Sequence, residues 1–122
     1  MNARKLIFIC VEDPLLQYTL ATILEREGCQ VVSRWENQMA DFRLIDEPVD
    51  LLILDKSDCW DELWNHELSK IRCRSARQPI LILSAHLPDL ATFDCEDFGL
   101  CRIIQKPSDP AAILENARAL LK

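Results

Sequence analysis

Residues 49–55 read Val-Asp-Leu-Leu-Ile-Leu-Asp, a short apolar run that ends abruptly at a carboxylate. Its apolar residues are consecutive rather than alternating, which is typical of a strand covered on both faces. Such strands occur in parallel sheets that have helices on either side. The pattern therefore predicts a buried strand over residues 51–54, with Asp55 directly after it.

Runs of the same character occur elsewhere in the chain. Three of them are rich in Ile, Leu, Val or Phe and end at polar residues, and they cover residues 6–11, 80–83 and 101–104. A weaker candidate strand covers residues 29–33. The sequence thus predicts five short strands.

In the segments between these strands, the apolar residues have the spacing expected of helices. Pro14 suits the first turn of a helix, and Gly28 stands where a helix would end. The apolar stripe expected on this helix consists of Leu15, Leu16, Leu20, Ile23 and Leu24. Shorter helices are expected over residues 37–45, 60–71 and 88–95.

A last helix is predicted to begin at Pro110, with Ser108 or Asp109 as its cap. Its inward residues are expected to be Ile113, Leu114, Ala117, Leu120 and Leu121. Strand and helix then alternate five times, with connections too short for another domain. We therefore expect one α/β domain over residues 1–122, a doubly wound five-stranded parallel sheet with the flavodoxin-like strand order 2-1-3-4-5.

Composition narrows the classes of function. The net charge of −6 and a pI near 4.8 argue against a nucleic-acid surface, which needs a basic patch. The chain shows no signal peptide and no apolar run long enough to span a membrane, so we expect a cytoplasmic protein. Its six cysteines include no C-x-x-C pair, and most are expected to be reduced and at least half-buried.

Polar residues follow four of the predicted strands. Glu12 and Asp13 follow the first, Asp55 the third, Ser84 the fourth and Lys106 the fifth. Each has an ordinary reading by itself, since acidic residues are common at helix starts and Lys-Pro is common in turns. In a doubly wound sheet, however, the carboxyl ends of the strands are where ligands bind. We therefore expect these side chains to converge on one rim.

The chain resembles the receiver domain of two-component response regulators over essentially its whole length. The resemblance lies in four segments in the same order, residues 11–16, 49–55, 79–85 and 106–107 with the helix that follows. It implies a signalling module rather than an enzyme. Its partner would be a histidine kinase or a phosphotransfer protein, with no direct contact to nucleic acid or membrane.

The resemblance also implies a role for each rim residue. Asp55 would accept a phosphoryl group from the kinase, and Lys106 and Ser84 would contact the phosphoryl oxygens. Mg²⁺ would be the cofactor, held by Glu12, Asp13, Asp55 and the carbonyl of Ser57. Inward movement of Ser84 would then be the switch.

The acidic pair at the end of the first strand departs from the family pattern. If Pro14 fixes the alignment, Val11 stands where the first acidic residue belongs and Glu12 is the second. If the loop is one residue shorter, Glu12 and Asp13 are the pair. The sequence leaves both alignments open, and the first would weaken metal binding.

Other departures from the family pattern affect the loop after the acceptor residue and the surface that would contact a partner protein. Lys56 follows the acceptor where an apolar residue is usual, and Ile103 replaces a common aromatic residue. A second hypothesis is therefore a receiver-like domain that acts without phosphorylation as a dimerisation or docking module. Its dimer surface would be the fourth helix, fifth strand and fifth helix, around Arg102, Ile103 and Gln105.

Overall fold

A computed structural model describes residues 4–11, 13–34, 49–56, 78–84, 101–105 and 109–121 of the chain. For Arg34, Asp55 and Lys56 it describes the backbone alone. The expected helices over residues 37–45, 60–71 and 88–95 lie outside the described residues.

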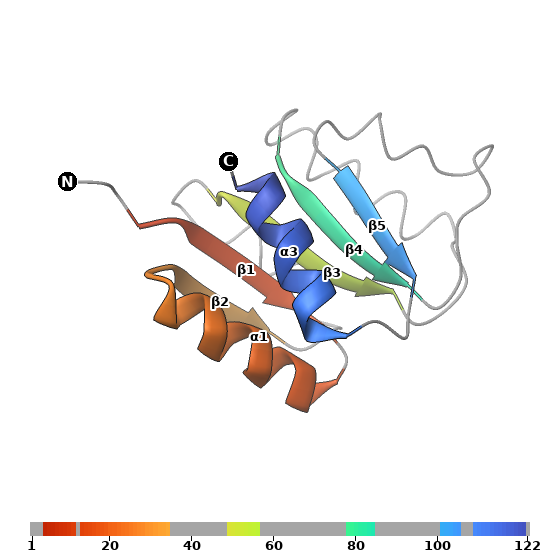
Figure 1. Ribbon diagram of the computed structural model, residues 1–122, viewed down its shortest axis with the longest axis horizontal. Helices are drawn as coiled ribbons and strands as arrows, with labels where there is room; N and C mark the ends of the chain where they lie inside the picture. Colours follow the sequence, from red (N-terminus) through yellow and green to blue (C-terminus); the bar gives the residue numbers. More distant parts are fainter. Residues whose placement is uncertain are drawn as a thin grey trace.

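The sheet has five parallel strands in the order β2-β1-β3-β4-β5, and all of them run in the same direction (Figure 1). The strands are β1 (Leu6–Cys10), β2 (Gln30–Arg34), β3 (Leu51–Lys56), β4 (Ile80–Ser84) and β5 (Cys101–Gln105). The predicted fold class and strand order are therefore confirmed. The strand predicted over residues 29–33 is shifted by one residue, and the third runs two residues further than expected.

Two helices, α1 (Pro14–Arg26) and α3 (Pro110–Leu120), cover the same face of the sheet (Figure 1). Asp109 caps α3, because its Oδ1 accepts hydrogen bonds from the backbone N–H groups of Ala111 at 2.7 Å and Ala112 at 3.3 Å. Pro110 then occupies the first turn, where no intrahelical N–H bond is lost. Of the two caps that the sequence allowed, the structure has Asp109.

The end of α1 depends on a glycine. Gly28 has a φ of 93°, the left-handed region that side chains with a Cβ disfavour. Beyond it, the N–H of Cys29 donates to the carbonyl of Leu24 at 3.0 Å and closes the helix. This turn directs the chain into β2.

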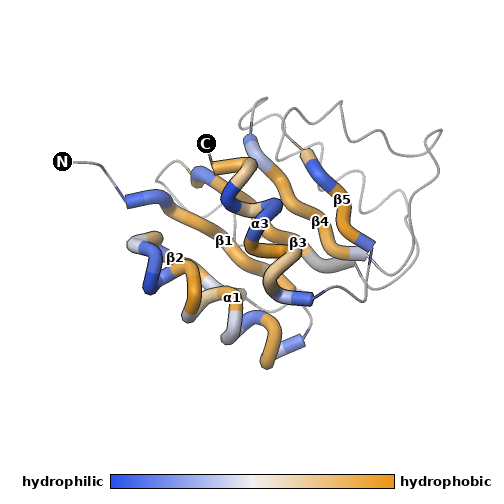
Figure 2. The backbone as a smooth tube through the Cα atoms, in the orientation of Figure 1, coloured by the Kyte–Doolittle hydropathy of each residue, from blue (hydrophilic) through white to orange (hydrophobic). Residues whose placement is uncertain are grey.

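Both faces of the three central strands, β1, β3 and β4, are buried, and these strands form the apolar centre of the molecule (Figure 2). The face under the helices contributes Ile7, Ile9, Val11, Leu51, Ile53, Leu81 and Leu83 to one cluster. The helices add Leu20, Leu24, Ile113, Leu114, Ala117 and Leu120 to it. A second cluster, on the other face, contains Leu6, Phe8, Cys10, Val49, Leu52, Leu54, Ile80 and Ile82. Consecutive apolar residues in the strands are thus explained by burial on both sides.

The predicted stripe of α1 is wrong at Leu15. Leu20 and Leu24 are buried, but the side chain of Leu15 is 72% exposed. At 3.6 residues per turn, Leu15 points roughly 140° away from Leu20 and 180° away from Leu24. It therefore lies on the solvent side of the helix, together with Tyr18, which is 69% exposed.

The cysteines differ in state. Cys10 is buried and Cys29 half-buried, and neither is in a disulfide. Cys101 is disulfide-bonded and is thus an exception to the expectation that most of the cysteines are reduced. Sequence spacing does not reveal which cysteines are neighbours in space, which is what decides pairing. Within the described residues, no helix is long and apolar enough to cross a membrane.

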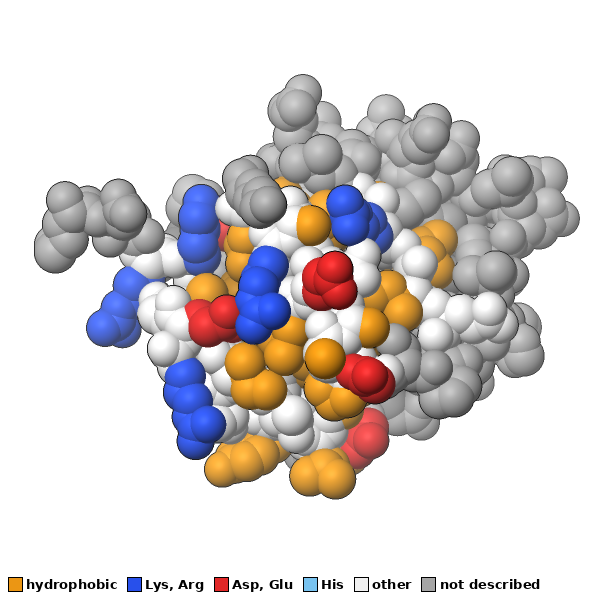
Figure 3. All heavy atoms as spheres, viewed as in Figure 1, with side chains coloured by type: hydrophobic (Ala, Val, Ile, Leu, Met, Phe, Trp, Pro, Cys, Tyr) orange, Lys and Arg blue, Asp and Glu red, His pale blue; other side chains and the backbone are white. Residues whose placement is uncertain are grey.

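Polar contacts join elements at the surface. Arg118 in α3 donates from Nε to Oε1 of Glu27, after α1, at 2.7 Å. Arg102 in β5 donates to Oδ1 of Asn116 in α3 at 2.9 Å. Basic and acidic side chains are interspersed on the face that carries α1 and α3 (Figure 3).

Leu20 and Leu15 form a matched pair for testing this packing. We expect Leu20→Ala to lower the free energy of unfolding by about 2–5 kcal/mol, because it leaves a cavity in the cluster beneath α1. Leu15→Ala removes the same atoms from an exposed site and should change it by no more than about 0.5 kcal/mol. Urea denaturation followed by circular dichroism measures both, and equal effects would contradict the assigned orientation of α1.

Candidate functional site

The register of the sheet aligns the carboxyl ends of its central strands. Cys10 pairs with Leu54 between β1 and β3, and Asp55 pairs with Leu83 between β3 and β4. Neighbouring strands are about 4.8 Å apart, so the backbones of residues 11, 55 and 83 meet at one rim. The backbone of the predicted acceptor, Asp55, thus lies between the ends of β1 and β4.

Ser84 is the last residue of β4 and has no exposed surface. Its backbone pairs with Lys56 on one side and Gln105 on the other. Ser84 is therefore one step beyond the residue that pairs with Asp55. The register places these two predicted site residues on adjacent strands, next to each other at the rim.

Asp13 was expected at the rim as a ligand of Mg²⁺, but in the structure it also has a role in the fold. Its backbone is extended, at φ −79° and ψ 114°, and its Oδ1 accepts a hydrogen bond from the N–H of Leu15 at 2.9 Å. Asp13 is thus the N-cap of α1, with Pro14 in the first turn. The signal was present in the sequence as Asp-Pro before an apolar helical pattern, the ordinary reading of an acidic residue at a helix start.

Val11 lies between β1 and this cap and has no exposed surface. It packs in the cluster beneath the helices, which also contains Leu83 and Ile53. Since Cys10 and Leu54 are partners, Val11, the residue directly after β1, comes next to the backbone of Asp55. An isopropyl group therefore follows β1 at the position beside the backbone of the predicted acceptor.

These two side chains favour the alignment in which Pro14 is fixed. Val11 then takes the first acidic position of the receiver pattern, Glu12 the second, and Asp13 the helix cap. Glu12, Ser57 and Lys106 lie outside the described residues, as does the side chain of Asp55. Lys106 follows Gln105, the residue of β5 that pairs with Ser84.

The structure describes few of the expected Mg²⁺ ligands. Asp13 is the one expected ligand whose side chain is described, and one of its oxygens is engaged by the helix. Among the described side chains, no group of three His, Cys, Asp or Glu residues is arranged to hold a metal ion. The other expected ligands, Glu12, Asp55 and the carbonyl of Ser57, stay predictions of the sequence.

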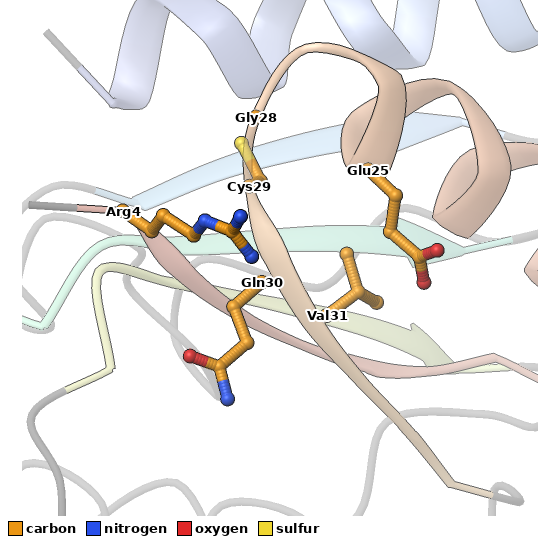
Figure 4. A pocket seen from close by; sticks show the side chains of 6 residues that line it. All are labelled: Arg4, Glu25, Gly28, Cys29, Gln30 and Val31. Carbon is orange, nitrogen blue, oxygen red and sulfur yellow. The ribbon is translucent and has the colours of Figure 1, made fainter.

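A pocket of about 370 Å³ lies elsewhere, at the start of β2, and its lining includes Arg4, Glu25 and Cys29 (Figure 4). Burial raises the pKa of the Cys29 thiol, and the carboxylates of Glu27 and Asp50 raise it further, against a smaller opposing effect of Lys5. A raised pKa keeps the sulfur protonated and weakly nucleophilic. This pocket is at the amino ends of the strands, away from the rim at Asp55.

No protein-family model matches this chain, and no curated protein matches it in sequence. Solved structures do match it. A response regulator from Thermotoga maritima is 19% identical with a TM-score of 0.71, and 98% of each chain is covered. The non-phosphorylated HemR receiver domain from Leptospira biflexa is 22% identical with a TM-score of 0.74, covering 98% of this chain and 95% of its own.

The chemotaxis response regulator CheY4 of Vibrio cholerae is 16% identical with a TM-score of 0.73, covering 98% of this chain and 100% of its own. Sequence identities of this size, together with the TM-scores, show a shared fold. They do not show a shared chemistry, which depends on the residues at the rim. The parallel order β2-β1-β3-β4-β5 and this likeness over almost the whole chain lead to the same conclusion. The chain has the CheY-like fold of response regulator receiver domains.

Proposed function

We propose that the chain is a phosphoacceptor receiver domain of a two-component system, switched by phosphorylation of Asp55. The observation that carries the proposal is the register of β1, β3 and β4. It brings the end of β3, where Asp55 lies, beside the buried Ser84 of β4. A carboxylate at the switch point of a doubly wound sheet is positioned for ligand chemistry.

In the proposed reaction, a carboxylate oxygen of Asp55 attacks the phosphorus of a phosphohistidine. The P–N bond breaks, the imidazole leaves, and an acyl phosphate forms on Asp55. Lys106 would neutralise charge on the phosphoryl oxygens, and Ser84 would donate its hydroxyl to one of them. Mg²⁺, held by Glu12, Asp55 and the Ser57 carbonyl, would lower the repulsion between the two anionic reactants.

The exposed side of α1 supports a protein donor. Leu15 and Tyr18 are three residues apart on a helix and therefore adjacent on its surface. They are in the first turns of α1, immediately after the rim at the end of β1. A histidine kinase or phosphotransfer protein seated on this apolar pair would bring its phosphohistidine close to Asp55.

Acetyl phosphate gives a direct test, because it supplies a phosphoryl group without a protein donor. We expect incubation with acetyl phosphate and Mg²⁺ to add one phosphoryl group to the chain, detected by intact-mass spectrometry. Asp55→Asn should abolish this gain, because an amide does not form the acyl phosphate.

Asp50→Asn is the matched control, since Asp50 precedes the other end of the same strand. Its Oδ2 accepts from the N–H of Leu6 at 2.7 Å, a contact that an asparagine oxygen also makes. This variant should be phosphorylated like the wild type. A wild-type chain that gains no phosphoryl group, or an Asp55→Asn variant that still gains one, would refute the proposal.

A second candidate function follows from Val11 and Asp13. With an apolar residue beside the acceptor and a carboxylate engaged in the helix cap, the chain also suits a receiver-like module that works without phosphorylation. It would form a homodimer through the helix expected over residues 88–95, strand β5 and helix α3. On β5, Arg102 and Gln105 are exposed. The hydrogen bond from Arg102 to Asn116 holds the two described elements of this surface together.

For this second candidate we expect the untreated chain to dimerise in analytical ultracentrifugation. Arg102→Glu should raise the dimer dissociation constant by about tenfold or more, because it reverses a charge and breaks the contact to Asn116. Tyr18→Ser, on the exposed side of α1, should leave the dimer unchanged. A chain that is monomeric at all concentrations until it is phosphorylated would exclude this candidate.

A further inference from the structure

We infer that Val11 and Asp13 leave the acidic rim short of cation ligands, so that the chain binds Mg²⁺ weakly and gains affinity when a carboxylate is placed at residue 11. The inference rests on the proposed function, because it concerns the same rim. It identifies Val11 as the residue that sets the metal requirement of this site.

The first step is the position of Val11. The partners Cys10 and Leu54 place Val11, the residue directly after β1, next to the backbone of Asp55. Val11 also belongs to the same buried cluster as Leu83, the β4 partner of Asp55. Its side chain is completely buried. An isopropyl group offers a cation no oxygen, and Mg²⁺ takes oxygen ligands almost exclusively.

The second step is the position of Asp13. Its Oδ1 is 2.9 Å from the N–H of Leu15, at the helix end where the partial positive charge of the backbone favours a carboxylate. To serve as a full ligand, Asp13 would have to give up this cap or share its charge with it. Asp13 is therefore a helix-capping residue first and a poor substitute for the carboxylate missing at residue 11.

The third step is the dependence of affinity on charge. The affinity of oxygen sites for divalent ions depends on how many carboxylates they contain. With Val11 apolar and Asp13 in the cap, Glu12 and Asp55 are the remaining carboxylates of the expected set. A carboxylate at residue 11 would add a charged ligand directly after β1, next to the backbone of Asp55.

Calorimetric titration with Mg²⁺ alone tests this inference on the intact chain. We expect Val11→Asp to bind Mg²⁺ about tenfold or more tightly than the wild type. Val11→Asn is the matched control, because it has the same shape and polarity without the charge, and it should gain much less. Equal affinities of the wild type and a folded Val11→Asp variant would overturn the inference.

Because Val11 is buried, the aspartate variant can fail to fold without the ion. Circular dichroism with and without Mg²⁺ detects this, and folding restored by Mg²⁺ supports the inference. If the variant is unfolded in both conditions, Asp13→Asn decides, because asparagine keeps the cap and loses the charge. We expect the wild type to bind Mg²⁺ weakly or not at all, and Asp13→Asn to leave this binding unchanged. If the wild type binds Mg²⁺ tightly and Asp13→Asn weakens this binding, the inference is overturned.

Acetyl phosphate labelling separates this inference from the proposed function. If Val11→Asp binds Mg²⁺ more tightly and neither protein is phosphorylated, the inference stands and the proposed function fails. If both proteins are phosphorylated at Asp55 with the same dependence on Mg²⁺ concentration, the proposed function stands and the inference fails.

Discussion

Parallel pairing of β1 with β3 and of β3 with β4 is the constraint on which the other features of the molecule depend. Both faces of these strands are buried, so each apolar side chain has a place in one of two clusters. A slip of one residue would move every side chain of a strand to the opposite face, so the pattern of burial holds the register. The register in turn decides which residues meet Asp55 at the rim.

The connection from β1 to α1 serves the fold and the site at once. Within a few residues the chain buries Val11, caps a helix with Asp13 and enters it at Pro14. A buried apolar residue and a capped helix both stabilise the domain. Each also takes a position or a carboxylate away from the rim, so local stability and the proposed cation site make opposing demands on the same short segment.

Much of the fold follows from the sequence, because continuous apolar runs and Pro and Gly at helix ends are local signals. The strands, α1 and α3 were predicted from these signals, and the strand order from the alternation of strands and helices with right-handed crossovers. Leu15 was assigned to the wrong side of α1, because five leucines and isoleucines in thirteen residues leave the direction of the stripe to the packing. The capping bond of Asp13 and the disulfide at Cys101 depend on neighbours in space, which the order of residues does not reveal.

The contact between Arg102 and Asn116 extends further into α3 than one hydrogen bond. While Oδ1 of Asn116 accepts from Arg102, its Nδ2 donates to the carbonyl of Ala112 at 2.9 Å, one turn earlier in the helix. A single amide thus connects an edge strand, β5, to the backbone of the first turn of α3. Strand β5 and α3 are consequently joined twice, by this chain of polar contacts at the surface and by Ile104 of β5, which packs against the cluster beneath α3.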